Sequence, residues 1–152
     1  MWESAHVARC WASRVIDADA ERVFAAITTL ELHRDLIPFT RVQAPPPPPR
    51  RGDRVVATSL GLLRDTMLIT RARPPQGEQR GVVIFKKIGP VLLGWASIAV
   101  TPLDARTCRV HWMEDVHLIA PLRMAQPLLD RVLTAMTRRA LRLLDRQLRS
   151  RH

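Results

Sequence analysis

The sequence has little cysteine, little lysine and no long apolar run, and each shortage excludes a class of protein. With two cysteines in 152 residues, the chain is not a disulfide-stapled miniprotein; Cys10 and Cys108 are expected to be reduced thiols, although one bridge between them stays open. The apolar stretches 91–93 and 95–100 are separated by glycine and end before Pro102, well short of the ~20 residues that span a bilayer. The first residues show neither a basic leader nor an apolar run, so no secretory signal is expected and a cytoplasmic location follows by default.

The composition that remains is that of a globular domain with a strong positive charge. The chain is 47% apolar and 25% charged, which excludes a wholly disordered or collagenous protein, and its length predicts a single domain over residues 1–152. Twenty-four basic and 14 acidic side chains give a net charge of +10, which suits nucleic acid, an anionic membrane or an acidic partner. Lys86 and Lys87 are the only lysines, and the arginines are scattered along the chain, which weakens the nucleic-acid interpretation.

Alternation of apolar residues predicts one early strand and a later run of strands. A strand is expected over 4–16, a helix over about 20–30, and a second short helical piece over 31–38 that Pro38 ends. The five prolines of 45–49 predict a stiff polyproline II spacer. Short turns then connect five strands in an antiparallel sheet, over 54–63, 65–73, 81–88, 91–100 and 106–118.

The last segment, 122–150, predicts a long amphipathic helix of roughly 40 Å. Pro127 suits a first turn, so the helix either begins near Ala125 or is kinked there. The buried stripe is expected to consist of Leu122, Ala125, Leu129, Val132, Leu133, Met136, Ala140, Leu143 and Leu144. Arg131, Arg138, Arg142 and Arg149 lie opposite, as on the solvated back of a surface helix.

This order of elements resembles the START-like, or SRPBCC, superfamily, whose helix-grip fold is shared with birch pollen allergens. Segments 16–39 and 107–144 are similar to the strand-to-helix entry and to the last strand and closing helix of its polyketide cyclase/dehydrase and lipid-transport branch. The resemblance implies an α+β fold in which a curved antiparallel sheet of six to seven strands wraps around a long C-terminal helix, with two short helices after the first strand. It also implies a cavity between sheet and helix that holds an apolar molecule.

The leading functional hypothesis is therefore the binding, and possibly transport, of a small hydrophobic ligand such as a lipid or polyketide. The residues expected to hold it are Phe39, Trp95, Val110, Trp112, Glu114, Leu129, Val132 and Met136. Phe39 is placed at the entrance by the resemblance, while the other residues come from the last strands and the helix stripe. The Lys86–Lys87 pair precedes the turn at Gly89 and is expected at the same rim or in a solvated turn.

Glu114 is the residue with the clearest chemical interest. Period-two geometry puts it on the same face as Val110 and Trp112, so burial there would raise its pKa and make it a candidate acid, base or hydrogen-bond donor. A polyketide cyclase or dehydratase that uses Glu114 is the enzyme alternative. A bulge near Glu114, or an ion pair with Arg71 or Arg73, would explain the residue without any function.

Other chemistries have little support in the sequence. His111, Asp115 and His117 share a strand face, but only Asp115 and His117 are close enough to chelate one ion, so no metal site is predicted. No nucleotide-binding glycine loop or Ser/His/Asp motif is present, and no cofactor is expected. An adaptor that meets nucleic acid, ribosome or anionic membrane through Arg131, Arg138 and Arg142 stays as a third alternative, and the sequence does not define an oligomeric state.

Overall fold

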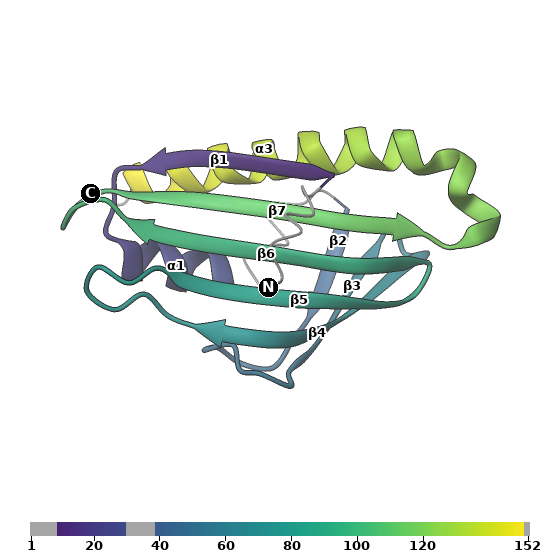
Figure 1. Cartoon of the computed structure of the whole chain (residues 1–152), viewed down its shortest axis with the longest axis horizontal. Helices are drawn as coiled ribbons and strands as arrows, with labels where there is room; N and C mark the ends of the chain where they lie inside the picture. The colour runs from purple at the N-terminus through teal and green to yellow at the C-terminus, as the bar shows by residue number, and fades with distance from the viewer. Residues whose placement is uncertain (1–8, 30–38, 151–152) are drawn as a thin grey trace, which may run out of the picture.

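The computed structural model describes residues 9–29 and 39–150 and shows one antiparallel sheet with a long helix along it (Figure 1). The strands are β1 (Cys10–Ile16), β2 (Thr40–Gln43), β3 (Arg54–Ser59), β4 (Leu63–Arg73), β5 (Gly81–Pro90), β6 (Leu92–Pro102) and β7 (Cys108–Leu118). The helices are α1 (Ala20–Thr28), the 3-10 helix η2 (Ala120–Ala125) and α3 (Gln126–Arg149). The strand order is β1-β7-β6-β5-β4-β3-β2, so the first strand pairs with the last.

This architecture is the helix-grip fold that the sequence predicts: a curled sheet of seven strands, a short helix after the first strand and a long C-terminal helix. β2 was missed, because a four-residue strand carries too little alternation to be recognised. The predicted second short helix, over 31–38, lies outside the described residues. α3 begins at Gln126 with a proline in its first turn, as the position of Pro127 predicts.

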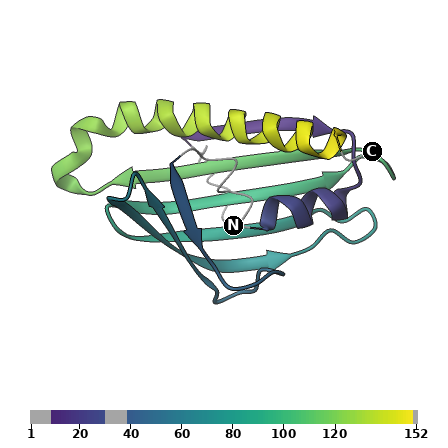
Figure 2. The same cartoon turned by 180° about the vertical axis from the view of Figure 1, so that it is seen from behind.

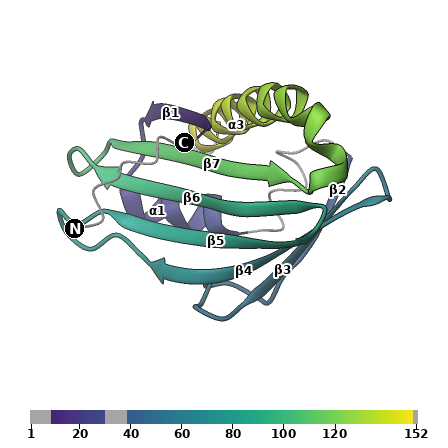
Figure 3. The same ribbon diagram turned by 45° about the vertical axis from the view of Figure 1, so that its right-hand side comes forward.

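Irregular strands curl the sheet (Figure 3). The β4–β5 register shifts twice, first at Ile88, an extra residue of β5, and then at Thr70, an extra residue of β4, and such bulges bend a strand. In β6, Gly94 has φ +122°, and a Cβ atom placed there would lie 2.0 Å from the Asp115 carbonyl oxygen of β7. Only glycine therefore fits at this close approach of β6 and β7.

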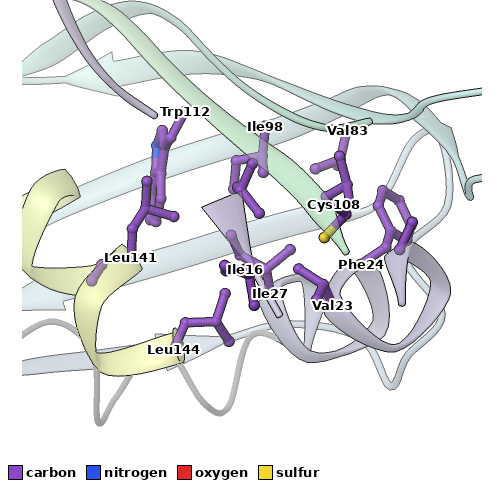
Figure 4. Close-up of a cluster of buried hydrophobic side chains, with 14 of the residues drawn as sticks. Ile16, Val23, Phe24, Ile27, Val83, Ile98, Cys108, Trp112, Leu141 and Leu144 are labelled. Carbon is purple, nitrogen blue, oxygen red and sulfur yellow. The ribbon is translucent and has the colours of Figure 1, made fainter. Parts of the chain in front are cut away.

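α1 and α3 cover the concave face, as the view from behind shows (Figure 2). α1 starts behind the N-cap Asp19, whose carboxylate accepts a hydrogen bond of 2.9 Å from the Arg22 backbone N–H, and it buries Val23, Phe24 and Ile27. Figure 4 shows these side chains meeting residues of the sheet and of α3 in one core.

α3 is fastened to the edge strand β1 by a buried carboxylate. Asp145, 2% exposed, accepts a hydrogen bond of 2.8 Å from Arg14 Nε of β1 and another of 2.9 Å from Arg149 Nε. Burial alone would raise the pKa of Asp145, but the hydrogen bonds from Arg149 and Arg14 outweigh burial and lower it.

The buried face of α3 differs from the predicted stripe in its outer members. Leu133, Ala140 and Leu144 are buried as expected. Val132 and Leu122 are 53% and 44% exposed, so their assignment to the buried stripe was wrong. The residues that replace them on the buried face are Thr137, Leu141, Asp145 and Leu148. The predicted stripe contained only apolar residues and so left out Thr137 and Asp145. Asp145 is nevertheless buried, and Arg14 of β1 pairs with it.

Candidate functional site

Three charged side chains are buried on the concave face, each from a different strand. They are Asp65 of β4, Lys87 of β5 and Glu114 of β7, which are 8%, 7% and 4% exposed. Charged residues are almost never this deeply buried unless they are paired, so the group is the most unusual chemical feature of the interior. We call these three residues the charged cluster.

The strand register brings the charged cluster together. Lys87 lies opposite Gly94 of β6, and Glu114 lies opposite Ala96 of the same strand. Because those two residues of β6 carry only a hydrogen atom and a methyl group, little side-chain volume separates Lys87 from Glu114. The negative charge of Glu114 is the largest favourable influence on the Lys87 ammonium, which is consistent with this proximity.

The hydrogen bonds within the charged cluster are incomplete. Lys87 Nζ forms an ion pair with Asp65 Oδ2 and contacts Met67 Sδ at 3.5 Å. Trp112 Nε1 donates a hydrogen bond of 3.2 Å to Glu114 Oε1. The other oxygens of the two carboxyl groups, Asp65 Oδ1 and Glu114 Oε2, are buried without a hydrogen-bond partner. Such an atom costs about 1–3 kcal/mol of stability, so it marks a place where another group would be accommodated favourably.

Two groups of the charged cluster, Glu114 and Lys87, have raised pKa values. Burial raises the pKa of Glu114, and the charge of Asp65 adds to this, against the opposing influence of Lys87 and of the Trp112 hydrogen bond. Burial alone would lower the pKa of Lys87, but the charges of Glu114 and Asp65 outweigh burial and raise it. Lys87 and Asp65 balance each other's charge, and the raised pKa of Glu114 means that this third group holds its proton to a higher pH than an exposed glutamate does.

The structure places three of the predicted ligand residues together and separates the others. Val110, Trp112 and Glu114 share the concave face of β7. The register of β7 with both neighbours runs unbroken through Glu114, so the alternative of a bulge there was wrong. Arg71 and Arg73 are exposed, and the cationic neighbour of Glu114 is Lys87 instead.

Three of the predicted ligand residues lie elsewhere. Trp95 pairs with Asp115, the neighbour of Glu114 in sequence, so it lies on the opposite face of the sheet. Phe39 is 80% exposed at the start of β2, and Val132 is 53% exposed on the outer side of α3. Strand alternation turns Trp95, and the orientation of α3 turns Val132, away from the concave face, whereas the exposure of Phe39 leaves its predicted place at an entrance untested.

The two remaining candidates on α3, Leu129 and Met136, belong to a second apolar cluster. They are partly buried against Cys10, Leu92, Val116 and Leu133, at the contact of α3 with β1 and β7. This position is compatible with a role in the wall of a ligand site but does not bring them to the charged cluster.

Sequence reasoning missed Lys87 and Asp65, although a signal for both was present. Val83, Phe85 and Lys87 alternate along β5, and Asp65, Met67 and Ile69 alternate along β4, so each charged residue continues a buried face. The expectation that Lys87 lies at a rim or in a solvated turn was wrong, because β5 runs on to Pro90.

Two hollows border the elements around the concave face. One, of about 240 Å³, lies between the end of α1, β2 and the proline-rich loop, and its walls include Thr28, Val42, Pro47 and Ile69. Ile69, which lines this hollow, is two residues along β4 from Met67, and Met67 contacts Lys87 of the charged cluster. The other hollow, of about 490 Å³, lies between β1 and α3 and is lined by Trp11, Ala12, Ser13, Arg14, Arg138, Leu141 and Arg142.

No metal site is apparent in the described part of the chain, where no group of three or more His, Cys, Asp or Glu side chains is arranged to hold an ion. Asp115 contacts Arg9 at 3.7 Å and His117 at 3.5 Å instead. No helix within residues 9–29 and 39–150 has both the length and the apolar character needed to cross a membrane.

Comparison with known proteins assigns the chain to a class with this fold. A family model described as polyketide cyclase / dehydrase and lipid transport matches residues 8–149, and the chain belongs to that family. No curated protein sequence matches the chain.

Solved structures of low sequence identity share the fold. A hypothetical protein from Helicobacter pylori is 10% identical with a TM-score of 0.70, covering 91% of this chain and 86% of its own. The Zhui aromatase/cyclase from Streptomyces sp. R1128 is 13% identical with a TM-score of 0.62, covering 91% and 93%. Norcoclaurine synthase from Thalictrum flavum, solved with dopamine and hydroxybenzaldehyde, is 14% identical with a TM-score of 0.51, covering 87% and 85%.

Proposed function

We propose that the chain binds a small, mainly apolar molecule that carries a hydrogen-bonding group, and that the charged cluster receives this group. The observation that carries the proposal is the pair of buried carboxyl oxygens, Asp65 Oδ1 and Glu114 Oε2, that have no partner within an otherwise apolar face. A ligand that supplied a partner there would recover part of the free energy that burial of these atoms costs. Membership of the polyketide cyclase / dehydrase and lipid transport family supports the same class of ligand.

The charge state of the cluster favours an oxygen-bearing ligand. Glu114 in its protonated form can donate one hydrogen bond, and the Lys87 ammonium has a donor beyond those directed to Asp65 and Met67. A carbonyl or hydroxyl oxygen of the ligand fits these donors, and a hydroxyl hydrogen also fits Asp65 Oδ1. A fully apolar molecule would satisfy none of them.

The apolar part of the ligand is assigned to the hollow beside Ile69. Its volume of about 240 Å³ is below the range of roughly 300–1,000 Å³ typical of drug-sized ligands, so a compact molecule is expected. Met67 contacts Lys87 and lies two residues from Ile69, which lines this hollow. Because a methionine side chain is unbranched and flexible, it can adapt to a ligand that reaches from the hollow toward Lys87.

A comparison of naphthalene with 2-naphthol, which differ by one hydroxyl group, tests the proposal. Both fluoresce, so their dissociation constants can be measured by titration. We expect 2-naphthol to bind about tenfold more tightly than naphthalene, as one hydrogen bond to a charged or acidic group predicts. Glu114→Leu should reduce this difference, because it removes one of the groups that bind the hydroxyl, and it should leave naphthalene binding intact.

Filling the hollow provides the second arm of the test. Val42→Trp should weaken both compounds at least tenfold, since Val42 is a partly buried wall residue. Leu103→Trp, a matched change at an exposed position in the β6–β7 turn, should weaken neither. Equal affinities of the two compounds for the wild-type protein, or unchanged binding by Val42→Trp, would contradict the proposal.

A second candidate function is proton-transfer catalysis at the same place, which the raised pKa of Glu114 beside the Lys87 ammonium favours. In the dehydration of a β-hydroxy ketone, Glu114 would protonate the leaving hydroxyl, and its carboxylate would then take the proton from the carbon next to the carbonyl. Glu114→Gln separates the two candidates. It should preserve naphthalene binding in both cases, and it should abolish water loss only if Glu114 transfers the proton.

A further inference from the structure

Large apolar side chains are strongly exposed at one end of the molecule. Leu62 and Met124 are 90% and 97% exposed, Phe39 and Leu60 are 80% and 72% exposed, and Leu122 is 44% exposed. We call these five residues the apolar end. Single exposed apolar residues are ordinary on protein surfaces, but a group of them marks an interaction site.

The sheet register shows that these residues share one end although they come from three separate segments. Thr40, next to Phe39, pairs with Ser59, and the β3–β4 hairpin that holds Leu60 and Leu62 closes there. Across the sheet, Asp65 pairs with Pro90 at the β5–β6 turn, and Leu92 pairs with Leu118 just before η2. Figure 1 shows the β3–β4 hairpin, the β5–β6 turn and η2 at the same, right-hand end.

The charges of the surface are distributed unequally between the two ends. The exposed acidic residues within 9–29 and 39–150 lie at the opposite end, beside the β1–α1 connection, the β4–β5 turn and the β6–β7 turn; they are Asp17, Asp19, Glu21, Glu78 and Asp104. Exposed arginines occur at both ends, with Arg73, Arg80 and Arg106 at the acidic end, but the apolar end carries Arg41, Arg64 and Arg123 without an exposed acidic residue in the described part of the chain. Its surface is therefore both apolar and positively charged.

We infer that the apolar end docks on the surface of a phospholipid bilayer that contains anionic lipid. The exposed side chains project from separate turns, and a bilayer receives such projections without the matched shape that a protein partner must supply. Arginines beside them complement anionic headgroups, where each contributes about 1 kcal/mol near the surface. The inference does not depend on the ligand proposed above, and it uses a different surface from the arginine row of α3.

Sedimentation with sucrose-loaded vesicles tests this inference on the full chain. We expect binding to phosphatidylcholine vesicles that carry phosphatidylglycerol, weaker binding to phosphatidylcholine alone, and weakening by added salt. The double variant Leu62→Ser/Met124→Ser should lose at least tenfold in apparent partitioning, since two exposed apolar side chains would no longer enter the bilayer. Arg64→Gln/Arg123→Gln should lose about tenfold on the anionic vesicles and little on the neutral ones.

Matched controls come from the opposite end, where Leu103 and Arg106 are exposed in the β6–β7 turn. Leu103→Ser and Arg106→Gln should bind vesicles as the wild type does, and thermal unfolding should verify that every variant is folded. Absence of wild-type binding to anionic vesicles would overturn the inference. Equal losses from variants at the two ends would also overturn it, because that result indicates a general effect of charge or hydrophobicity.

Discussion

Glu114 shows how one buried residue can make the stability of a protein depend on pH. Its carboxyl group lies among apolar side chains and receives one hydrogen bond from Trp112, and burial raises its pKa. A raised pKa means that, in the interval between the ordinary and the shifted pKa, the folded protein holds a proton that the unfolded chain releases. The contribution of Glu114 to stability is therefore complete at low pH and is lost as the pH rises.

Glu114→Gln is expected to change the pH dependence of stability in a specified direction. The free energy of unfolding of the variant, relative to that of the wild type, should increase as the pH rises above about 4.3, the ordinary pKa of glutamate, because glutamine carries no charge to bury. Urea unfolding at a series of pH values measures this difference. Glu78→Gln, which changes an exposed glutamate, serves as the control. A relative stability that decreases with pH would contradict the raised pKa.

Lys87 and Asp65 form the buried ion pair of the charged cluster, so replacing either residue alone leaves the other as an unpaired buried charge. Lys87→Met should lower the free energy of unfolding by about 3–5 kcal/mol, since Asp65 is left as an uncompensated buried charge. The double variant Lys87→Met/Asp65→Leu should be more stable than Lys87→Met, because the unpaired charge is gone. Urea unfolding of the wild type, both single variants and the double variant measures the coupling, and strictly additive losses would contradict it.

At the scale of elements, the curvature of the sheet depends on β4, β5 and β6 rather than on the turns. The bulges at Ile88 of β5 and Thr70 of β4 and the positive φ of Gly94 in β6 bend the strands near the charged cluster. The arrangement of α3 depends on β1 in a similar way, since Arg14 binds the buried Asp145. The concave face is thus formed by a few local departures from regular geometry.

Gly94→Ala tests the close approach of β6 and β7. The new Cβ atom would lie 2.0 Å from the Asp115 carbonyl oxygen, so the backbone must move and the variant should lose more than about 2 kcal/mol of stability. Gly61→Ala is the matched control, because Gly61 also has a positive φ, +68°, but has open space around it. Its loss should be about 1 kcal/mol. Equal losses in thermal or urea unfolding would mean that φ alone explains the glycine at position 94.

At the scale of the whole molecule, the two cysteines lie far apart. Cys10 is opposite Glu114 and Cys108 is opposite Ile16, so six residues of β7 separate their positions, or roughly 20 Å at 3.3 Å per residue. A disulfide requires Cα atoms within about 7 Å, and both thiols are buried and free. Burial raises the pKa of Cys108 to about 11, which keeps this thiol protonated at neutral pH.

The thermal stability of the protein should therefore not depend on reducing agent. Melting followed by circular dichroism should give the same midpoint with and without dithiothreitol, and Cys10→Ser/Cys108→Ser should melt at the same temperature in both buffers. A fall in the wild-type midpoint on reduction would show that an intramolecular bridge forms after all.

The sequence by itself determined every element of the described fold except β2, including the long closing helix, and it put Glu114 on the strand face of Val110 and Trp112, because alternation and helical periodicity are local properties of the chain. It also carried the family resemblance that the family match confirms. Only the tertiary structure decided which partners meet Glu114, since Lys87 and Asp65 come from strands that register and curvature bring alongside. For the same reason it corrected Trp95 and Val132, whose orientation depends on how sheet and helix pack together.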